Sequence, residues 1–297
     1  MDTLNNLNNL NVPAQYDNRI SDKDKIFCET HYKAYKTAKK DLQELEAVLE
    51  NIKGRQSNIL KNIDDHSCPL DIYININNLT DKSIQNKIER IHFEYIGQIV
   101  KHFNHNYHIS IDLNKIYNEI LPNKPERFYF KANGEEFKKY YQEIYLLNID
   151  YKDILKQIFE QLNGRTFQER AIDEIKEKCK KASIDYYGNP IYELKNDTIA
   201  FNHYVCFHRK HINLDIWTIS ESFKEILLAL ALFETGMIGK YPPCINSILK
   251  CSEINNSNIP LDCDKVKQMK LYKNGRIDIK FTSKYYANRF IYEYFEA

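Results

Sequence analysis

The stretch VKQMKLYKNGRIDIKF, residues 266–281, carries the clearest strand signal in this chain. Two runs rich in apolar residues, Val266–Leu271 and Arg276–Phe281, flank the tripeptide Lys273-Asn274-Gly275. Asn-Gly between such runs is a strong signal for a β-hairpin, because the tight hairpin turn requires positive φ at its central residues. The stretch therefore predicts an antiparallel hairpin near the C-terminus.

Helices and further strands are predicted on both sides of this hairpin. A terminal helix begins at Ser283 and carries Tyr286, Phe290 and Tyr294 at a spacing of four. β-Branched and aromatic residues favour strands upstream, and Ser220 is suited to cap an apolar helix that Gly236 ends. The predicted upstream elements are helices over 135–147, 151–162 and 166–182, strands over 191–194 and 198–208, and a helix over 220–233.

Heptad spacing marks the N-terminal part of the chain. Apolar residues recur there at alternating spacings of four and three, which is the a/d pattern of a helical seam. A second amphipathic pattern over 81–103 provides a return helix, so a long helical hairpin is the simplest arrangement. Such a seam could serve packing within the chain or binding to a partner. The seam positions are Tyr35, Ala38, Leu42, Leu45, Leu49, Ile52, Ile59 and Ile63.

The predicted fold class is α+β and predominantly helical, with an N-terminal long helical hairpin and a C-terminal mixed domain that holds a small antiparallel sheet. Residues 1–20 are Asn-rich and are expected to form a flexible arm. We expect the helical hairpin over 21–103 and a connecting region of helices and loops over 104–150. Residues 151–297 are predicted to form the α+β domain, which ends in the basic β-hairpin and helix.

Composition limits the choice of partner and compartment. The 42 Lys and Arg residues against 41 Asp and Glu give a net charge of +1, so the overall field favours neither nucleic acid nor membrane. Seven cysteines without a CxxC spacing are typical of a reducing cytoplasm. The N-terminus lacks a signal-peptide pattern, and the longest apolar run, Ile226–Phe233, has eight residues. We therefore expect a cytoplasmic protein with no membrane partner and no cofactor.

The segment LYKNGRIDIKF, residues 271–281, with the short helix after it, resembles the C-terminal signature of the family called domain of unknown function 4942. Ile158–Leu162, the basic helix that follows, the strand around Phe201–Phe207 and the Leu-rich helix Leu227–Phe233 extend this resemblance over residues 150–297. The resemblance implies a place on bacterial mobile elements and in phages, near toxin–antitoxin and DNA-modification genes. It implies no catalytic residue, and residues 1–150 show no such likeness.

Basic and aromatic side chains gather at the C-terminus. From Lys265 to the last residue there are eight Lys or Arg and three Asp or Glu, an excess of 8 − 3 = +5. Interleaved tyrosines add base stacking to phosphate contact, as nucleic-acid binding requires. A solvated edge hairpin, on which lysine discourages aggregation, explains the same residues without binding. The candidate binding residues are Lys267, Lys270, Tyr272, Lys273, Arg276, Lys280, Lys284, Tyr285 and Arg289.

Two histidine clusters could hold a metal, although we expect none. Zinc takes nitrogen and sulfur ligands, and on a continuous strand His203 would face away from the next two candidates. That leaves Cys206, His208 and His211 as the alternative metal set. The spacing of His102, His105 and His108 spreads them around a helix, so a solvated helix end is expected there.

A nuclease site is the alternative to a non-enzymatic protein. Glu193-Leu194-Lys195 after Asp185 resembles the acid and acid-x-lysine arrangement in which carboxylates hold Mg²⁺ and lysine orients water. The separation of eight residues is short for that plan, and such triplets are common at this Glu and Lys content. The chain also lacks a Gly-rich phosphate loop, a G-x-S-x-G elbow and an H-E-x-x-H motif.

Three hypotheses about function stay open. The first, which follows from the family context, is a non-enzymatic phage or mobile-element protein that modulates or inhibits a nucleic-acid-handling complex, such as an RNA-guided CRISPR nuclease, in counter-defence. The second is direct binding of RNA or single-stranded DNA. The third is a divergent Mg²⁺-dependent nuclease that uses Asp185, Glu193 and Lys195.

Overall fold

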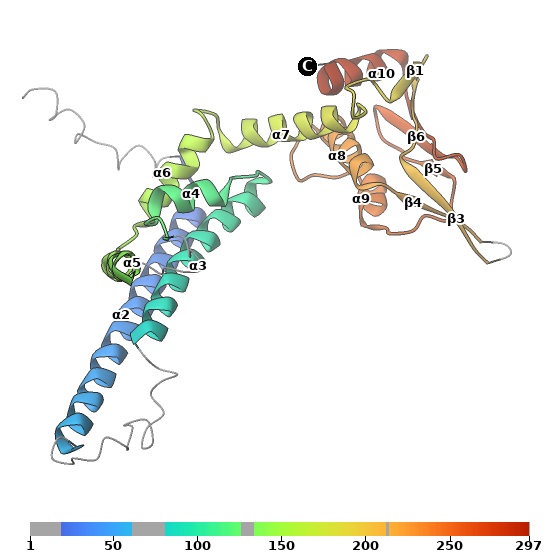
Figure 1. The fold of residues 1–297 in the computed structure, drawn as a ribbon. Coiled ribbons are helices and arrows are strands. Elements are labelled where there is room, and N and C mark those ends of the chain that lie inside the picture. Colours follow the sequence, from blue (N-terminus) through green and yellow to red (C-terminus); the bar gives the residue numbers. More distant parts are fainter. Residues whose placement is uncertain (1–18, 61–80, 126–133, 212–213, 297) are drawn as a thin grey trace, which may run out of the picture. The chain divides into compact units, whose positions relative to one another are not determined.

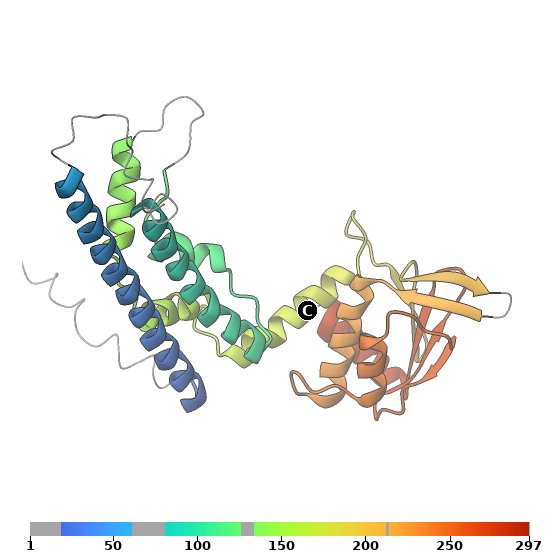
Figure 2. The same ribbon diagram turned by 90° about the horizontal axis from the view of Figure 1, so that it is seen from below.

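The computed structural model describes residues 19–60, 81–125, 134–211 and 214–296 (Figures 1 and 2). The chain divides into two compact units, residues 1–106 with 110–164 and residues 107–109 with 165–297. The predicted arm over 1–20 lies outside the described residues except for Arg19 and Ile20. The predicted fold class, α+β and predominantly helical, is confirmed.

Two long antiparallel helices form the frame of the N-terminal unit. Helix α2 (Asp22–Leu60) and helix α3 (Asp81–Tyr107) run side by side in both views (Figures 1 and 2). Asp24 near the start of α2 accepts a hydrogen bond from His102 near the end of α3, with Oδ1 and Nε2 2.7 Å apart. Because this bond joins the start of one helix to the end of the other, the two helices are antiparallel, as the sequence predicts.

The buried face of α2 differs from the predicted seam. Leu49 is buried as predicted, but Leu45 is 41% exposed, while Lys39 and Glu46 are only 5% and 9% exposed. Lys39 Nζ donates to the backbone oxygen of Leu147 at 2.7 Å, which offsets the cost of burying its charge. Because a straight helix has 3.6 residues per turn, its buried stripe drifts away from a strict heptad. The seam prediction is therefore wrong at Leu45 and at Ile59, which is 75% exposed, while the predicted position Ile63 lies outside the described residues.

Three shorter helices complete the N-terminal unit. They are α4 (Leu113–Ile120), α5 (Gly134–Leu146) and α6 (Tyr151–Gln161). Side chains of α5 pack against those of α3, with Tyr140, Ile144 and Ile88 in one buried cluster. Asp150 caps α6 through a capping box. The two units divide after residue 164, so α6 belongs with the N-terminal helices, whereas the sequence placed the boundary at 151.

A five-stranded antiparallel sheet organises the C-terminal unit, which begins with α7 (Phe167–Ala182). The predicted Asn-Gly hairpin joins its two longest strands, and Gly275 has the positive φ of +89° that the turn requires. The sheet order is β1 (Tyr192–Lys195), β2 (Thr198–Phe201), β7 (Ile277–Phe281), β6 (Val266–Leu271) and β5 (Asn258–Pro260).

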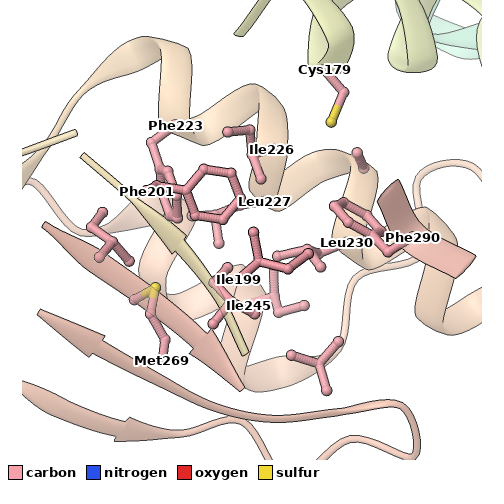
Figure 3. Close-up of a cluster of buried hydrophobic side chains, with 14 of the residues drawn as sticks. Cys179, Ile199, Phe201, Phe223, Ile226, Leu227, Leu230, Ile245, Met269 and Phe290 are labelled. Atoms are coloured by element: carbon pink, nitrogen blue, oxygen red, sulfur yellow. The ribbon is translucent and has the colours of Figure 1, made fainter. Parts of the chain in front are cut away.

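Helices pack against one face of this sheet and enclose the core. The helices are α8 (Glu221–Thr235), α9 (Pro243–Lys250) and α10 (Lys284–Ile291), and a π-helical turn over Tyr292–Glu296 follows α10. Alternate residues of the strands, such as Ile199, Phe201 and Met269, point into the core together with Leu227 and Phe290 (Figure 3). The other face of the sheet is turned away from this core.

The predicted continuous strand over 198–208 is wrong. The chain leaves the sheet after Phe201, and β3 (Val205–His211) pairs instead with β4 (Leu214–Ile219) in a two-stranded sheet. His203 adopts a φ of +67°, a left-handed conformation that ends a strand. The backbone N–H groups of Tyr204 and Val205 then both donate to the oxygen of Gly275, at 3.0 and 3.3 Å. A contact distant in sequence therefore sets this turn.

None of the helices within the described ranges has the length and the apolar character that crossing a bilayer requires.

Candidate nucleic-acid interface

Strand alternation gives the sheet a polar face, which we call the outer face. Residues next to the core-facing ones along each strand share this side, and the strand register aligns them in rows. Its lysines are exposed. The outer face comprises Glu193, Lys195, Thr198, Ala200, Asn258, Pro260, Lys267, Gln268, Lys270, Tyr272, Arg276, Asp278 and Lys280.

A β-bulge adds one cation to this face. Val266 and Met269 are both buried although they are three positions apart, which simple alternation does not allow. The register shifts between Val266 and Gln268, so Lys267 and Gln268 both lie on the outer side. Lys267 is exposed as a result.

Besides Lys267, three exposed ammonium groups are distributed over the strands of the outer face. Lys195 lies opposite Thr198 on the next strand, and Thr198 lies opposite Lys280. Two strand spacings therefore separate the two lysine Cα positions, which is about 10 Å. Lys270 lies opposite Asp278 one strand further along the sheet.

Arg276 and Asp278 hold the ring of Tyr272 in place. The Arg276 guanidinium donates to both Asp278 oxygens, at 2.6 and 2.7 Å, and the Tyr272 hydroxyl donates to Asp278 Oδ2 at 3.0 Å. Burial and the neighbouring carboxylate raise the pKa of Tyr272, so its hydroxyl stays protonated. The Arg276 guanidinium and the Lys270 ammonium each lie 5.1 Å from the ring centroid. The result is an ordered aromatic ring beside two cations, which suits a base and its phosphate.

Lys273 contributes to packing within the C-terminal unit more than to the charge of its surface. Its ammonium lies 2.5 Å from Asp215 Oδ2 on β4 and 4.7 Å from the ring centroid of Phe207 on β3. The hydrogen bond from Lys273 lowers the pKa of the Asp215 carboxyl, and Arg209 contributes in the same direction. Lys273 thereby ties the tip of the β6–β7 hairpin to the two-stranded sheet.

The remaining predicted binding residues lie elsewhere in the unit. Lys284, Tyr285 and Arg289 are exposed on α10, which packs on the core side of the sheet through Phe290. Arg289 also pairs with Glu293, at 2.5 Å. The nine residues predicted from the sequence are therefore not brought together on one surface. Lys267, Lys270, Tyr272, Arg276 and Lys280 share the outer face, whereas the other four do not.

Asp185, a candidate nuclease ligand, accepts hydrogen bonds from the backbone of its own turn. Its Oδ1 accepts the backbone N–H groups of Tyr187 and Asn189, both at 2.8 Å, and these bonds lower its pKa. Glu193 and Lys195 form an ion pair of 2.9 Å on the edge strand β1. Over the described part of the chain, no group of three or more His, Cys, Asp or Glu could hold a metal ion. We therefore propose no nuclease chemistry for Asp185, Glu193 and Lys195.

The residues of the two histidine clusters are not brought together as metal sites among the residues that the structure describes. Cys206 and His208 are exposed on one face of β3, while the side chain of His211 lies outside the described residues. His102 binds Asp24 and stacks on Phe27, with ring centroids 3.7 Å apart. The side chain of His102 therefore joins two helices, which the sequence did not predict, whereas His105 and His108 are exposed, as predicted for a solvated helix end.

Sequence reasoning missed Lys195 as a member of the outer face. The signal was present in the sequence, because Asn and Asp favour turns. In the structure, Asn196 and Asp197 alone separate β1 from β2, and Asn196 has a φ of +58°. A two-residue connection of this kind joins adjacent antiparallel strands.

Comparisons with protein-family models, with curated proteins and with solved structures found no match. The resemblance of residues 150–297 to domain of unknown function 4942 therefore stays a prediction.

Proposed function

We propose that this chain is a non-enzymatic, cytoplasmic binding protein that contacts RNA or single-stranded DNA through the outer face. The observation that supports this most is the position of Lys195, Lys270 and Lys280 on one sheet face with the ordered ring of Tyr272. A basic surface follows the phosphates, and an aromatic ring accepts a base of any sequence. Affinity of this kind depends little on sequence and strongly on salt.

The ion pairs on this face do not prevent phosphate binding. Lys280 Nζ lies 3.8 Å from Asp197 Oδ2, which is a loose contact between partly exposed groups. Lys195 is 2.9 Å from Glu193, and both of these side chains are at least half exposed. Exposed pairs of this type contribute little to stability, so a phosphate can replace the carboxylate at small cost. Arg276 is different, because its two short bonds to Asp278 keep Tyr272 in position. We therefore assign phosphate contact to the lysines and positioning to Arg276.

Replacing Lys270 and Lys280 together by Glu is expected to lower affinity for a single-stranded oligonucleotide at least tenfold. Each lost phosphate contact should also reduce the slope of log K against log salt by about 0.7. Fluorescence anisotropy of a labelled poly-U or poly-dT strand over a salt series measures both effects.

The matched control is the pair Lys178→Glu and Lys284→Glu, which changes the formal charge by the same amount. Both lysines are exposed on helices of the same unit, α7 and α10, away from the outer face. The control should bind almost as the unaltered protein does. Equal losses in the two double variants would mean that net charge, and not this face, governs binding.

A second candidate function is favoured by exposed apolar side chains on α2. Leu45, Val48 and Ile59 are 41%, 55% and 75% exposed, and aliphatic side chains of this kind can pack against another protein. We propose as the alternative a phage or mobile-element protein that modulates or inhibits a nucleic-acid-handling complex, such as an RNA-guided nuclease. Purification of a tagged copy from its natural host, with nuclease treatment of half the sample, separates the two candidates. A stoichiometric protein that survives nuclease supports the alternative, and recovery of nucleic acid alone opposes it.

A further inference from the structure

Two cysteine side chains meet in the C-terminal unit, at a place unrelated to the outer-face lysines. The Sγ atoms of Cys244 and Cys263 are 3.6 Å apart, although 19 positions separate the residues in sequence. Cys244 is the second residue of α9, and Cys263 lies in the connection between β5 and β6. Both side chains are partly exposed.

The backbone holds the two sulfur atoms in this arrangement. Both thiols donate to the backbone oxygen of the buried Leu261, Cys244 at 2.6 Å and Cys263 at 3.0 Å. The Cys263 N–H donates to the oxygen of Val266 at 3.3 Å. One buried carbonyl group therefore orients both thiols toward each other.

The next residues of the same connection are also fixed. A carboxylate at the end of α8, Glu234, accepts the backbone N–H groups of Asp264 at 2.7 Å and Lys265 at 3.0 Å. The connection that carries Cys263 is thus anchored to α8 on one side and to β6 on the other. The short distance between the sulfur atoms therefore depends on this anchored backbone and on the orientation of the two side chains.

We propose that Cys244 and Cys263 form a disulfide site whose co-reactant is a low-molecular-weight disulfide such as oxidised glutathione. A disulfide needs the sulfurs at about 2.05 Å, and rotation of side chains that already touch provides most of the required approach. This site goes beyond the proposed nucleic-acid binding and does not depend on it.

The reaction is a balanced thiol–disulfide exchange in two steps. Cys244 loses its thiol proton to solvent, and its sulfur attacks one sulfur of oxidised glutathione, which releases the first glutathione as a thiolate that takes up a proton. Cys263 then loses its proton, and its sulfur attacks the Cys244 sulfur and releases the second glutathione. Burial and the neighbouring thiol raise the pKa of Cys263 to about 12, so the exchange should become faster as the pH rises.

The bond would close a loop that contains α9 and the edge strand β5. In the reduced protein, β5 is a three-residue strand with a neighbour on one side only, so its pairing is among the weaker parts of the sheet. A link at Cys263 restrains the connection that follows β5 by joining it to α9. Hydrogen exchange of β5 amides should therefore slow on oxidation.

The experiment treats the full chain with oxidised glutathione and measures intact mass without reductant, followed by peptide mapping. The variant with Cys68→Ser, Cys206→Ser and Cys251→Ser removes two exposed thiols and the one that lies outside the described residues, and it leaves the proposed pair intact. This variant should lose two hydrogens and yield a cross-linked peptide of Cys244 with Cys263, and reduction should reverse both changes. An unchanged mass, a lasting glutathione adduct on either cysteine, or a cross-link to another cysteine would overturn the proposal.

Cys244→Ser and Cys263→Ser, each in the same background, provide the second measurement. Each variant should lose the cross-link, and Cys263→Ser should retain a glutathione adduct on Cys244 because the second step is blocked. A cross-link that persists in either variant would also overturn the proposal. Peptide mapping of the background variant, which retains Cys244 and Cys263, tests the proposal even if one of these two variants fails to fold.

Discussion

Replacing Phe290 by Ala is expected to lower the free energy of unfolding of the C-terminal unit by about 3–5 kcal/mol. Phe290 is fully buried on α10, and its ring centroid lies 5.4 Å from that of Phe233 and 4.9 Å from that of Tyr294. It also contacts Phe281 on β7, so it joins the helix to the sheet. A cavity at this point removes contacts on both sides.

Urea unfolding followed by tryptophan fluorescence measures this effect directly. The chain has one tryptophan, Trp217, and it is buried in the C-terminal unit, so the signal reports on that unit. Tyr285→Ala is the matched control, because this side chain is on the same helix but 65% exposed. The control should change stability by less than about 0.5 kcal/mol. A Phe290→Ala protein as stable as the control would contradict the described packing.

Acid is expected to destabilise the N-terminal helices through His92. This imidazole is fully buried; its Nε2 lies 2.9 Å from the backbone oxygen of Ile144 and its Nδ1 3.0 Å from the Tyr35 hydroxyl. The carbonyl can only accept, so Nε2 carries the proton and Nδ1 accepts from Tyr35. Burial lowers the pKa of His92, while the bond to Ile144 opposes that shift.

The direction of the pH effect follows from this lowered pKa. Below about pH 6.5 the unfolded chain binds a proton at His92 and the folded chain does not. Stability is therefore complete at neutral pH, falls as the pH drops below that value, and levels off once the folded imidazole is protonated. The slope attributable to this group reaches at most about 1.4 kcal/mol per pH unit.

Hydrogen exchange of α2 and α3 amides between pH 7 and pH 5, corrected for intrinsic rates, measures the change in opening free energy. His92→Gln should be less stable at pH 7 and should lose much of the pH dependence. His105→Gln alters an exposed imidazole on the same helix, and this variant should keep the pH dependence. If the unaltered protein and His92→Gln showed the same pH dependence, another group would be responsible.

Local signals predicted the elements whose geometry depends on near neighbours. Asn274-Gly275 indicated the β6–β7 hairpin because the turn needs a positive φ at glycine, and the structure has it. Ser220 and Gly236 bounded α8 correctly, since capping also acts within one turn of helix. The pairing of α2 with α3 followed from apolar periodicity alone.

Contacts between distant residues account for what the sequence did not predict. Lys39 is buried because Leu147 offers it a carbonyl oxygen, and no spacing within α2 contains that information. The break after Phe201 depends on the carbonyl of Gly275. The candidate binding residues were chosen as one cluster along the chain, but α10 turns back over the core and carries Lys284 away from the outer face.

The site itself was therefore predicted only in part. Residue types along β6 and β7 indicated basic and aromatic chemistry, and these strands do contribute to the outer face. The addition of Lys195 requires the register of two further strands, and the use of Lys273 inside the unit requires the position of Asp215. Strand order is a long-range property that composition does not contain.

Photo-crosslinking of a single strand that contains 4-thiouridine, followed by mass spectrometry of the adducts, tests the central claim most directly. The outer face predicts adducts on peptides of β6 and β7, above all at Tyr272, and their loss in the Lys270→Glu, Lys280→Glu protein. Adducts confined to α10 around Lys284 and Tyr285, or to α2, with none on β6 or β7, would contradict it.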